Sequence, residues 1–245
     1  MWQEGWVMIF DREPGDWKEL QTMVAQAFCE MNFDARVSVE VPLVRGKKEI
    51  DVLVREEIDR ITTLVFIECK FWNSAVPQEI VHGFRTVVAD GGAHKGYIIA
   101  KTGFQSGAYE VSDKTNVEVL TWEEFNKLYF PRWQRAANDR ITSHDLQFQK
   151  FREQPLRMTE TQSKAWHAIF QDGLRLTGNG FGRVLYKLDN GPYQMTYPEP
   201  DPSMVEIEDF FWQIKTHREF YDYMVPRLER FARRMDEWTA DYEGA

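Results

Sequence analysis

The most informative stretch of the chain is an apolar run at residues 64–72 that contains three residues of unlike chemistry, Glu68, Cys69 and Lys70. Its aliphatic and aromatic residues predict a strand apolar enough to lie inside a sheet. Side chains alternate along a strand, so Glu68 and Lys70 project from one face and Cys69 from the other. Charges at the end of such a strand have to be paired, hydrated or bound to a metal ion. The stretch therefore predicts either a structural ion pair or half of an active site.

Strand and helix patterns alternate on both sides of this run. Alternating or short apolar segments predict four more strands, at 34–44, 48–57, 95–100 and 117–120. Apolar residues at helical spacing predict helices at 16–31, 78–90, 103–115 and 121–130. The last helix begins at Thr121, with Glu124 three residues later, a spacing that predicts a capping box. This order of elements predicts an α/β domain that ends near Phe130.

The second part of the chain has a different pattern. Its predicted elements are helices at 131–156 and 159–176, a hairpin at 182–197 with its turn at 190–191, a proline-rich linker at 198–203, and one or two helices at 204–242 interrupted near Pro226. Its aromatic residues recur at helical intervals, which predicts a core or an oligomer interface rather than base-stacking platforms. We therefore predict two domains, an α/β domain at 1–130 and a mainly helical domain at 131–245 that carries no motif of known chemistry.

Composition restricts the environment and the partners of the chain. The net charge of −9 argues against a protein that coats nucleic acid by bulk attraction, although an enzyme that holds one phosphate remains compatible with it. The two cysteines, Cys29 and Cys69, form neither a disulfide framework nor a zinc motif. The chain contains no apolar run of membrane-spanning length, and its first residues do not resemble a cleavable signal. We therefore expect a cytoplasmic protein with no membrane partner.

Asp51 lies on the strand predicted just before the apolar run, on the face opposite Ile50 and Val52. If these two strands pair, Asp51 and Glu68 converge at one edge of the sheet with Lys70 beside them. Two carboxylates suit a hard cation such as Mg2+, which polarises a phosphoryl group and activates water. Lys70 would orient that water or stabilise charge in the transition state. The backbone carbonyl of Cys69 is a further candidate ligand. The set predicts hydrolysis of phosphodiester bonds.

The residues around this set resemble a known family. Asp51, the Glu68-Cys69-Lys70 sequence after an apolar strand, a following helix, and the segment 95–104, "KGYIIAKTGF", are similar to the PD-(D/E)xK nuclease superfamily and specifically to the Mrr-like restriction endonuclease catalytic domain. The resemblance covers roughly residues 16–130. It implies a restriction-endonuclease-like mixed sheet flanked by helices, followed here by a mainly helical C-terminal region. The short acidic and lysine signature alone is weak, and its specificity comes from this context.

The family pattern implies a role for each matching residue. Asp51 and Glu68 correspond to metal ligands and Lys70 to the catalytic cation, with Mg2+ as the cofactor and Mn2+ as a substitute. Glu19, on the first predicted helix, matches an acidic residue that often joins the metal ligands; the alternative is a solvated carboxylate on a helix surface. Gln78, at the start of the next helix, matches a polar residue near the metal or the phosphate, and the alternative is an ordinary first residue of a helix.

Two classes of function follow. The first is a metal-dependent DNA endonuclease of restriction or anti-phage defence type, with DNA as its partner and a junction- or RNA-directed nuclease as a variant. The second is a catalytically silent nuclease fold that serves in binding or scaffolding, in which the charged residues form an ion-pair network. A homodimer and a protein partner bound through 131–245 are further expectations. Arg45, Lys47 and Lys48 in the predicted hairpin turn are either a solvated charged turn or contacts for DNA phosphates.

Overall fold

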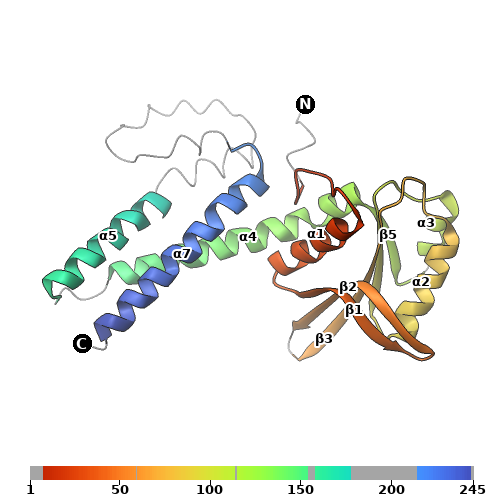
Figure 1. Ribbon diagram of the computed structural model, residues 1–245, viewed down its shortest axis with the longest axis horizontal. Coiled ribbons are helices and arrows are strands. Elements are labelled where there is room, and N and C mark those ends of the chain that lie inside the picture. The colour runs from red at the N-terminus through yellow and green to blue at the C-terminus, as the bar shows by residue number, and fades with distance from the viewer. Residues whose placement is uncertain (1–7, 59, 114, 154–157, 178–213, 244–245) are drawn as a thin grey trace. The chain divides into compact units, whose positions relative to one another are not determined.

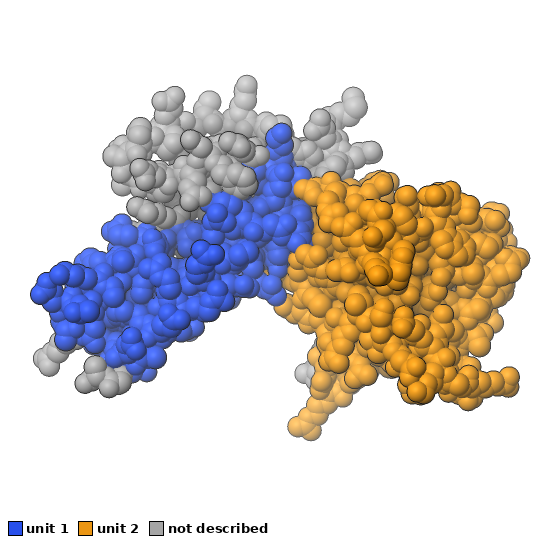
Figure 2. Space-filling model, viewed as in Figure 1, with its two compact units in different colours: residues 1–7, 137–245 blue, residues 8–136 orange. Residues whose placement is uncertain are grey.

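The computed structural model describes residues 8–58, 60–113, 115–153, 158–177 and 214–243 (Figure 1). The hairpin predicted at 182–197, the linker predicted at 198–203 and the part of the next predicted helix at 204–213 lie outside these residues. The chain divides into two compact units, which we call the α/β unit (Met8–Ala136) and the helical unit (Met1–Val7 and Ala137–Ala245) (Figure 2). The division predicted from the sequence, between 130 and 131, stays a proposal.

The α/β unit is built on one five-stranded mixed sheet in the order β1-β2-β3-β4-β5. Its strands are β1 Asp34–Leu43, β2 Gly46–Ile58, β3 Ile61–Lys70, β4 Lys95–Ala100 and β5 Val117–Thr121. The first three strands pair antiparallel, whereas β3, β4 and β5 pair parallel. The apolar run around Glu68 is therefore the central strand, as predicted, and the mixed sheet flanked by helices is confirmed.

Helices cover both faces of the sheet. They are α1 Trp17–Glu30, α2 Gln78–Asp90, α3 Ser106–Ser112 and the beginning of α4 Trp122–Arg152. Phe66 on β3 is fully buried in a core cluster with Val81 and Phe84 of α2. A Cβ atom added to Gly91, which caps α2, would clash with the Phe66 ring, so the helix can approach the strand only because that residue is glycine. This packing fixes β3, the strand that carries the candidate site.

Two helix starts show how the sequence sets the helix boundaries. The N–H of Glu124 donates to the Thr121 hydroxyl at 3.1 Å, and the N–H of Thr121 donates to the Glu124 carboxylate at 2.7 Å. This reciprocal pair is the predicted capping box. At α1 the Asp16 carboxylate accepts a hydrogen bond from the N–H of Glu19 at 2.8 Å, the usual N-cap arrangement. Both caps satisfy backbone donors that a helix leaves unpaired.

Proline does not end the helices where the sequence predicted. Helix α4 runs through Pro131 without a break, and α7 His217–Glu243 contains Pro226 in its interior. The predicted interruption near Pro226 is therefore wrong. An interior proline removes one hydrogen bond and strains the preceding turn, a cost of about 3 kcal/mol. Burial of apolar residues on both sides of Pro226, including Met224 and Leu228, offsets this cost.

The helical unit has its own core, formed by the later part of α4, α5 Glu160–Thr177 and α7. Its buried residues include Phe148, Phe151, Phe231 and Trp238. On α7, Phe220, Tyr221 and Tyr223 are also buried, so of the two predicted roles, core or oligomer interface, the core role is confirmed for these residues. The mainly helical character of the C-terminal region is confirmed as well. Among the helices that the structure describes, none is both long enough and apolar enough to cross a membrane.

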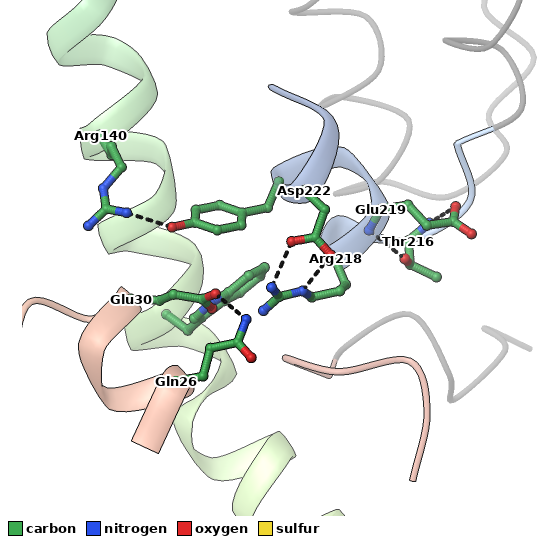
Figure 3. A network of polar contacts seen from close by, with 9 residues as sticks. Gln26, Glu30, Arg140, Thr216, Arg218, Glu219 and Asp222 are labelled. Atoms are coloured by element: carbon green, nitrogen blue, oxygen red, sulfur yellow. Dashed lines mark hydrogen bonds and ion pairs between the residues drawn. The ribbon is translucent and has the colours of Figure 1, made fainter. Parts of the chain in front are cut away.

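The first turns of α7 are held by polar contacts (Figure 3). The guanidinium group of Arg218 is buried and donates two hydrogen bonds to the Asp222 carboxylate, at 2.6 and 2.9 Å. The Thr216 hydroxyl accepts from the N–H of Glu219 at 3.0 Å and caps the helix. A buried arginine needs such a partner, because an unpaired charge in a core is costly. We therefore interpret this network as structural.

Candidate active site

The pairing of β2 with β3 brings Asp51 opposite Glu68. The antiparallel register pairs Val52 with Ile67, so the next residues along the two strands face each other. The backbone N–H of Cys69 donates a hydrogen bond of 2.7 Å to Oδ2 of Asp51. The carboxylate therefore serves as the acceptor at the point where the regular ladder ends. The predicted convergence of these two acidic residues is present in the structure.

Lys70 lies on the same face of β3 as Glu68, as side-chain alternation predicts. Its Nζ is 2.5 Å from Oε1 of Glu68, and the two side chains are only 15% and 11% exposed. Exposed ion pairs contribute little to stability because water and salt screen them. Screening is much weaker for a pair as shielded from solvent as this one. Lys70 also lies against the ring of Trp72, with Nζ 5.4 Å from the ring centroid. Trp72 itself is 39% exposed, beside the charged pair.

The second oxygen of Glu68 is not satisfied. In the part of the chain that the structure describes, Oε2 is buried and has no hydrogen-bond partner. Nζ of Lys48 lies 3.6 Å from it, which is an ion-pair distance but too long for a hydrogen bond. Buried polar atoms without partners are rare and costly in native structures. An oxygen of this kind, beside the Asp51 carboxylate, fits a hard cation such as Mg2+ that takes oxygen ligands.

Burial raises the pKa of Asp51, because a charged carboxylate is poorly solvated there. The Cys69 N–H opposes this shift by stabilising the charged form, and the neighbouring Glu68 charge adds to it. Lys70 and Lys48 lower the pKa of Asp51 by smaller amounts. A bound cation would relieve the repulsion between the two carboxylates.

Cys69 contributes its backbone rather than its thiol. The side chain is buried, and burial raises the pKa of the thiol well above its usual value. A protonated buried thiol is a poor nucleophile and a poor ligand for a hard cation. The N–H of Cys69 contacts Asp51, and the use of its carbonyl as a metal ligand stays a proposal.

Glu19 is engaged away from the acidic pair. Its carboxylate binds Nη2 of Arg12 at 2.7 Å and accepts from the N–H of Gly15 at 2.5 Å. The Arg12 hydrogen bond, followed by that from Gly15, lowers the pKa of Glu19. Across the described residues, no group of three or more His, Cys, Asp and Glu side chains is placed to hold a metal ion. The structure thus brings Asp51 and Glu68 together without Glu19.

Gln78 is the first residue of α2 and is exposed. Its side chain lies against α3, where a Cβ atom added to Gly107 would be 2.5 Å from Oε1 of Gln78. The amide therefore packs at the junction of α2 and α3. Its predicted role near the metal or the phosphate stays a proposal.

Two features of the site were not predicted from the sequence. The side chain of Lys48 reaches Glu68. Strand alternation does not predict this contact, because Lys48 precedes Asp51 by three residues and an odd spacing places the two side chains on opposite faces. The ladder between β1 and β2 pairs Val37 with Val52 but omits the next pair, Ser38 and Asp51. Ser38 has a φ of 53°, a left-handed conformation that is unusual for serine inside a strand. The strand geometry on the β1 side of Asp51 is therefore irregular, which simple alternation cannot anticipate.

One family model matches within the α/β unit. Residues 13–129 match the family model of the Mrr catalytic domain, described as "Restriction endonuclease". No curated protein matches the chain in sequence. Similar solved structures include the "Protein of Unknown Function AF1548", with 15% identity over 89% of this chain and 98% of that one, at a TM-score of 0.39.

Two restriction enzymes are among the other similar structures. The "DNA modification-dependent restriction endonuclease AspBHI" has 19% identity over 48% of this chain and a TM-score of 0.33. The "MspJI Restriction Endonuclease in Complex with 27-mer Oligonucleotide" has 14% identity over 50% of this chain and a TM-score of 0.28. This chain spans only 30% and 28% of those two proteins.

The mixed sheet, with acidic residues facing each other on β2 and β3, defines a restriction-endonuclease-like domain. The match of residues 13–129 to the restriction endonuclease model is consistent with a PD-(D/E)xK domain of the Mrr type. The resemblance to this family that the sequence predicted is confirmed over these residues.

Proposed function

We propose that the protein is a metal-dependent endodeoxyribonuclease of restriction or anti-phage defence type. The observation that carries this proposal is the convergence of Asp51, Glu68 and Lys70, with Oε2 of Glu68 buried and without a hydrogen-bond partner. The match of residues 13–129 to a restriction endonuclease family supports the same class of reaction. DNA is therefore the proposed substrate.

Asp51 and Glu68 are the residues that would hold Mg2+, or Mn2+ in its place. The bound ion would supply a Lewis acid that polarises the phosphoryl group and activates water. The N–H of Cys69 donates to Oδ2 of Asp51, and the other oxygen of this carboxylate is the proposed ligand. The adjacent carbonyl of Cys69 is a proposed further ligand. Glu19 remains a proposed ligand only if its contacts with Arg12 and Gly15 are released.

Lys70 is the proposed catalytic cation. Its ammonium is shielded from solvent, so its charge acts more strongly than it would at an exposed position. Its Nζ is paired with Oε1 of Glu68. There it is held at the site, where it would orient a water molecule or stabilise negative charge that develops on the phosphate. Gln78, at the start of α2, is proposed to assist near the phosphate.

The second candidate function is a nuclease fold that binds without cutting. The short contact between Lys70 and Glu68 favours this alternative, because a carboxylate of the protein itself pairs with the lysine. In that case the charged residues would be an ion-pair network. Homodimer formation, and selection of a target or a protein partner by residues 131–245, are proposals that fit either function.

Nuclease assays on a panel of substrates test the proposal. Supercoiled plasmid, linear duplex, single-stranded DNA, a four-way junction and RNA would each be incubated with Mg2+, Mn2+ or EDTA. We expect metal-dependent cleavage inside DNA, seen as nicked or linear plasmid, that is lost with EDTA and with Lys70→Ala. Cleavage of RNA or of the junction alone would reassign the substrate. A folded protein that cuts none of these would favour the binding function.

A further inference from the structure

Lys48 is the residue of the site whose role neither the family pattern nor the strand pattern explains. It lies on β2, and its Nζ is 3.6 Å from Oε2 of Glu68. That oxygen has no hydrogen-bond partner among the described residues, whereas Lys70 already binds the other oxygen. Lys48 therefore approaches the unsatisfied side of the carboxylate without completing a bond to it.

The neighbouring Lys47 shows what an ordinary lysine of this hairpin does. Its Nζ binds Oε1 of Glu40 at 2.7 Å, and both side chains are largely exposed, at 67% and 63%. Lys48 differs because its partner, Glu68, is only 11% exposed, while its own side chain is 37% exposed. The Lys48 side chain is thus more accessible to solvent than the carboxylate that it approaches. An anion from solvent can therefore contact Lys48 close to Glu68.

We propose that Lys48 is a substrate-binding residue whose ammonium contacts the phosphodiester to be cut; this inference rests on the proposed nuclease function. A cation bound at Oε2 of Glu68 would repel the ammonium of Lys48, since both carry positive charge a few ångströms apart. The lysine stem is long and flexible, so the ammonium can move without movement of the strand. A DNA phosphate held at the same cation is the anion it would then meet. The ammonium of Lys48 would therefore leave Glu68 and contact the substrate phosphate.

This exchange has two consequences of opposite sign. Without DNA, Lys48 opposes binding of a divalent cation at Glu68, so removal of its charge should tighten metal binding. With DNA, Lys48 neutralises one phosphate, so its removal should weaken DNA binding and reduce the salt dependence of that binding. If Lys48 only supported the fold, its removal would weaken both metal binding and DNA binding or would change neither.

The experiment compares Lys48→Ala and Lys48→Arg with Lys47→Ala, which removes the same charge one residue away. Mn2+ binding to the DNA-free protein would be measured by calorimetry. Binding of a labelled duplex would be measured by fluorescence anisotropy with Ca2+ over a range of salt concentrations, and cleavage by steady-state kinetics. Circular dichroism would establish that each variant is folded.

For Lys48→Ala we expect Mn2+ affinity to rise about threefold to tenfold, because one repelling charge is removed. The slope of the logarithm of DNA affinity against the logarithm of salt concentration should fall by about one. KM for DNA should rise about tenfold, whereas Lys48→Arg, which keeps the charge, should recover most of the DNA affinity. Lys47→Ala should change each quantity less than about twofold.

Equal salt slopes and equal KM values for Lys48→Ala and Lys47→Ala, in a wild-type background that binds Mn2+ and cuts DNA, would overturn the inference alone. Loss of Mn2+ affinity in Lys48→Ala would overturn it as well, because the lysine would then support the site rather than the substrate. A wild-type protein that neither binds Mn2+ nor cuts DNA would overturn the proposed function, and the role of Lys48 with it.

Discussion

The backbone N–H of Cys69 donates a hydrogen bond to the Asp51 carboxylate at 2.7 Å, where the pairing of β2 with β3 ends. This one contact joins the two strands through a side chain instead of through the backbone ladder. It fixes the position of a partly buried carboxylate opposite Glu68. The site is therefore built into the central strands of the sheet and does not depend on a loop.

Removal of the Lys70 charge should destabilise the fold as well as the reaction. Lys70→Ala removes the cation that binds Oε1 of the mostly buried Glu68. The Lys48 ammonium, 3.6 Å from Oε2, forms no hydrogen bond that could replace it. We expect the free energy of unfolding to fall by about 1 to 3 kcal/mol, less than for a fully buried pair, since some solvent reaches both groups. Denaturant unfolding in EDTA would measure the loss.

The matched control for that prediction is the double variant Lys70→Ala with Glu68→Gln. Glutamine removes the unpaired charge, so the double variant should recover much of the stability that Lys70→Ala loses. It should recover no cleavage. Equal stability of the wild-type protein and Lys70→Ala would show that the pair contributes nothing to the fold.

The raised pKa of Asp51 predicts how stability depends on pH in the metal-free protein. Burial makes folded Asp51 hold its proton to a higher pH than it does in the unfolded chain. Between the two pKa values the folded state binds more protons, so the contribution of Asp51 to the free energy of unfolding falls as pH rises. Asp51→Asn lacks this proton. Its stability relative to the wild type should therefore increase with pH across that window and be constant above it.

This dependence would be measured by denaturant unfolding of both proteins in EDTA at a series of acidic pH values. Other carboxylates titrate in the same range, and the difference between the two proteins cancels their contributions. A stability difference that is constant with pH, or that changes in the opposite direction, would contradict a raised pKa for the buried Asp51 carboxylate.

Glu19 provides a test of which acidic residues form the site. Its carboxylate is engaged by Arg12 and Gly15, so Glu19→Gln should change Mn2+ affinity by less than about threefold. Glu68→Gln, measured in the same calorimetric titration, should abolish detectable binding because it removes a direct ligand. A large loss of affinity in Glu19→Gln would show that Glu19 moves to the metal when the site is loaded.

The sequence predicted the parts of the fold that depend on local periodicity. Alternation identified β3 and placed Glu68 and Lys70 on one face, and the spacing of Thr121 and Glu124 identified a capping box. These features require only short-range geometry. The pairing of β2 with β3, which brings Asp51 to the site, followed once the two strands were assumed to be neighbours.

Features that depend on tertiary packing were not predictable in the same way. Pro226 predicted a break in a helix, but burial along α7 outweighs the local cost of the proline. The contact of Lys48 with Glu68 is contrary to simple alternation, and it lies next to an irregular part of the sheet at Ser38. Glu19 matched the family pattern in sequence position, yet its partners are set by the Arg12 side chain and the turn at Gly15.

The most direct test of the central claim compares Asp51→Asn with the wild type in one assay of Mn2+ binding and plasmid cleavage. Asparagine has nearly the same shape and keeps an oxygen that can accept from the N–H of Cys69, but it lacks the charge that a metal ligand needs. We predict a folded variant in which Mn2+ binding is lost and cleavage falls by at least about a hundredfold. Cleavage at the wild-type rate by a folded Asp51→Asn protein would contradict the assignment of the metal site to Asp51 and Glu68.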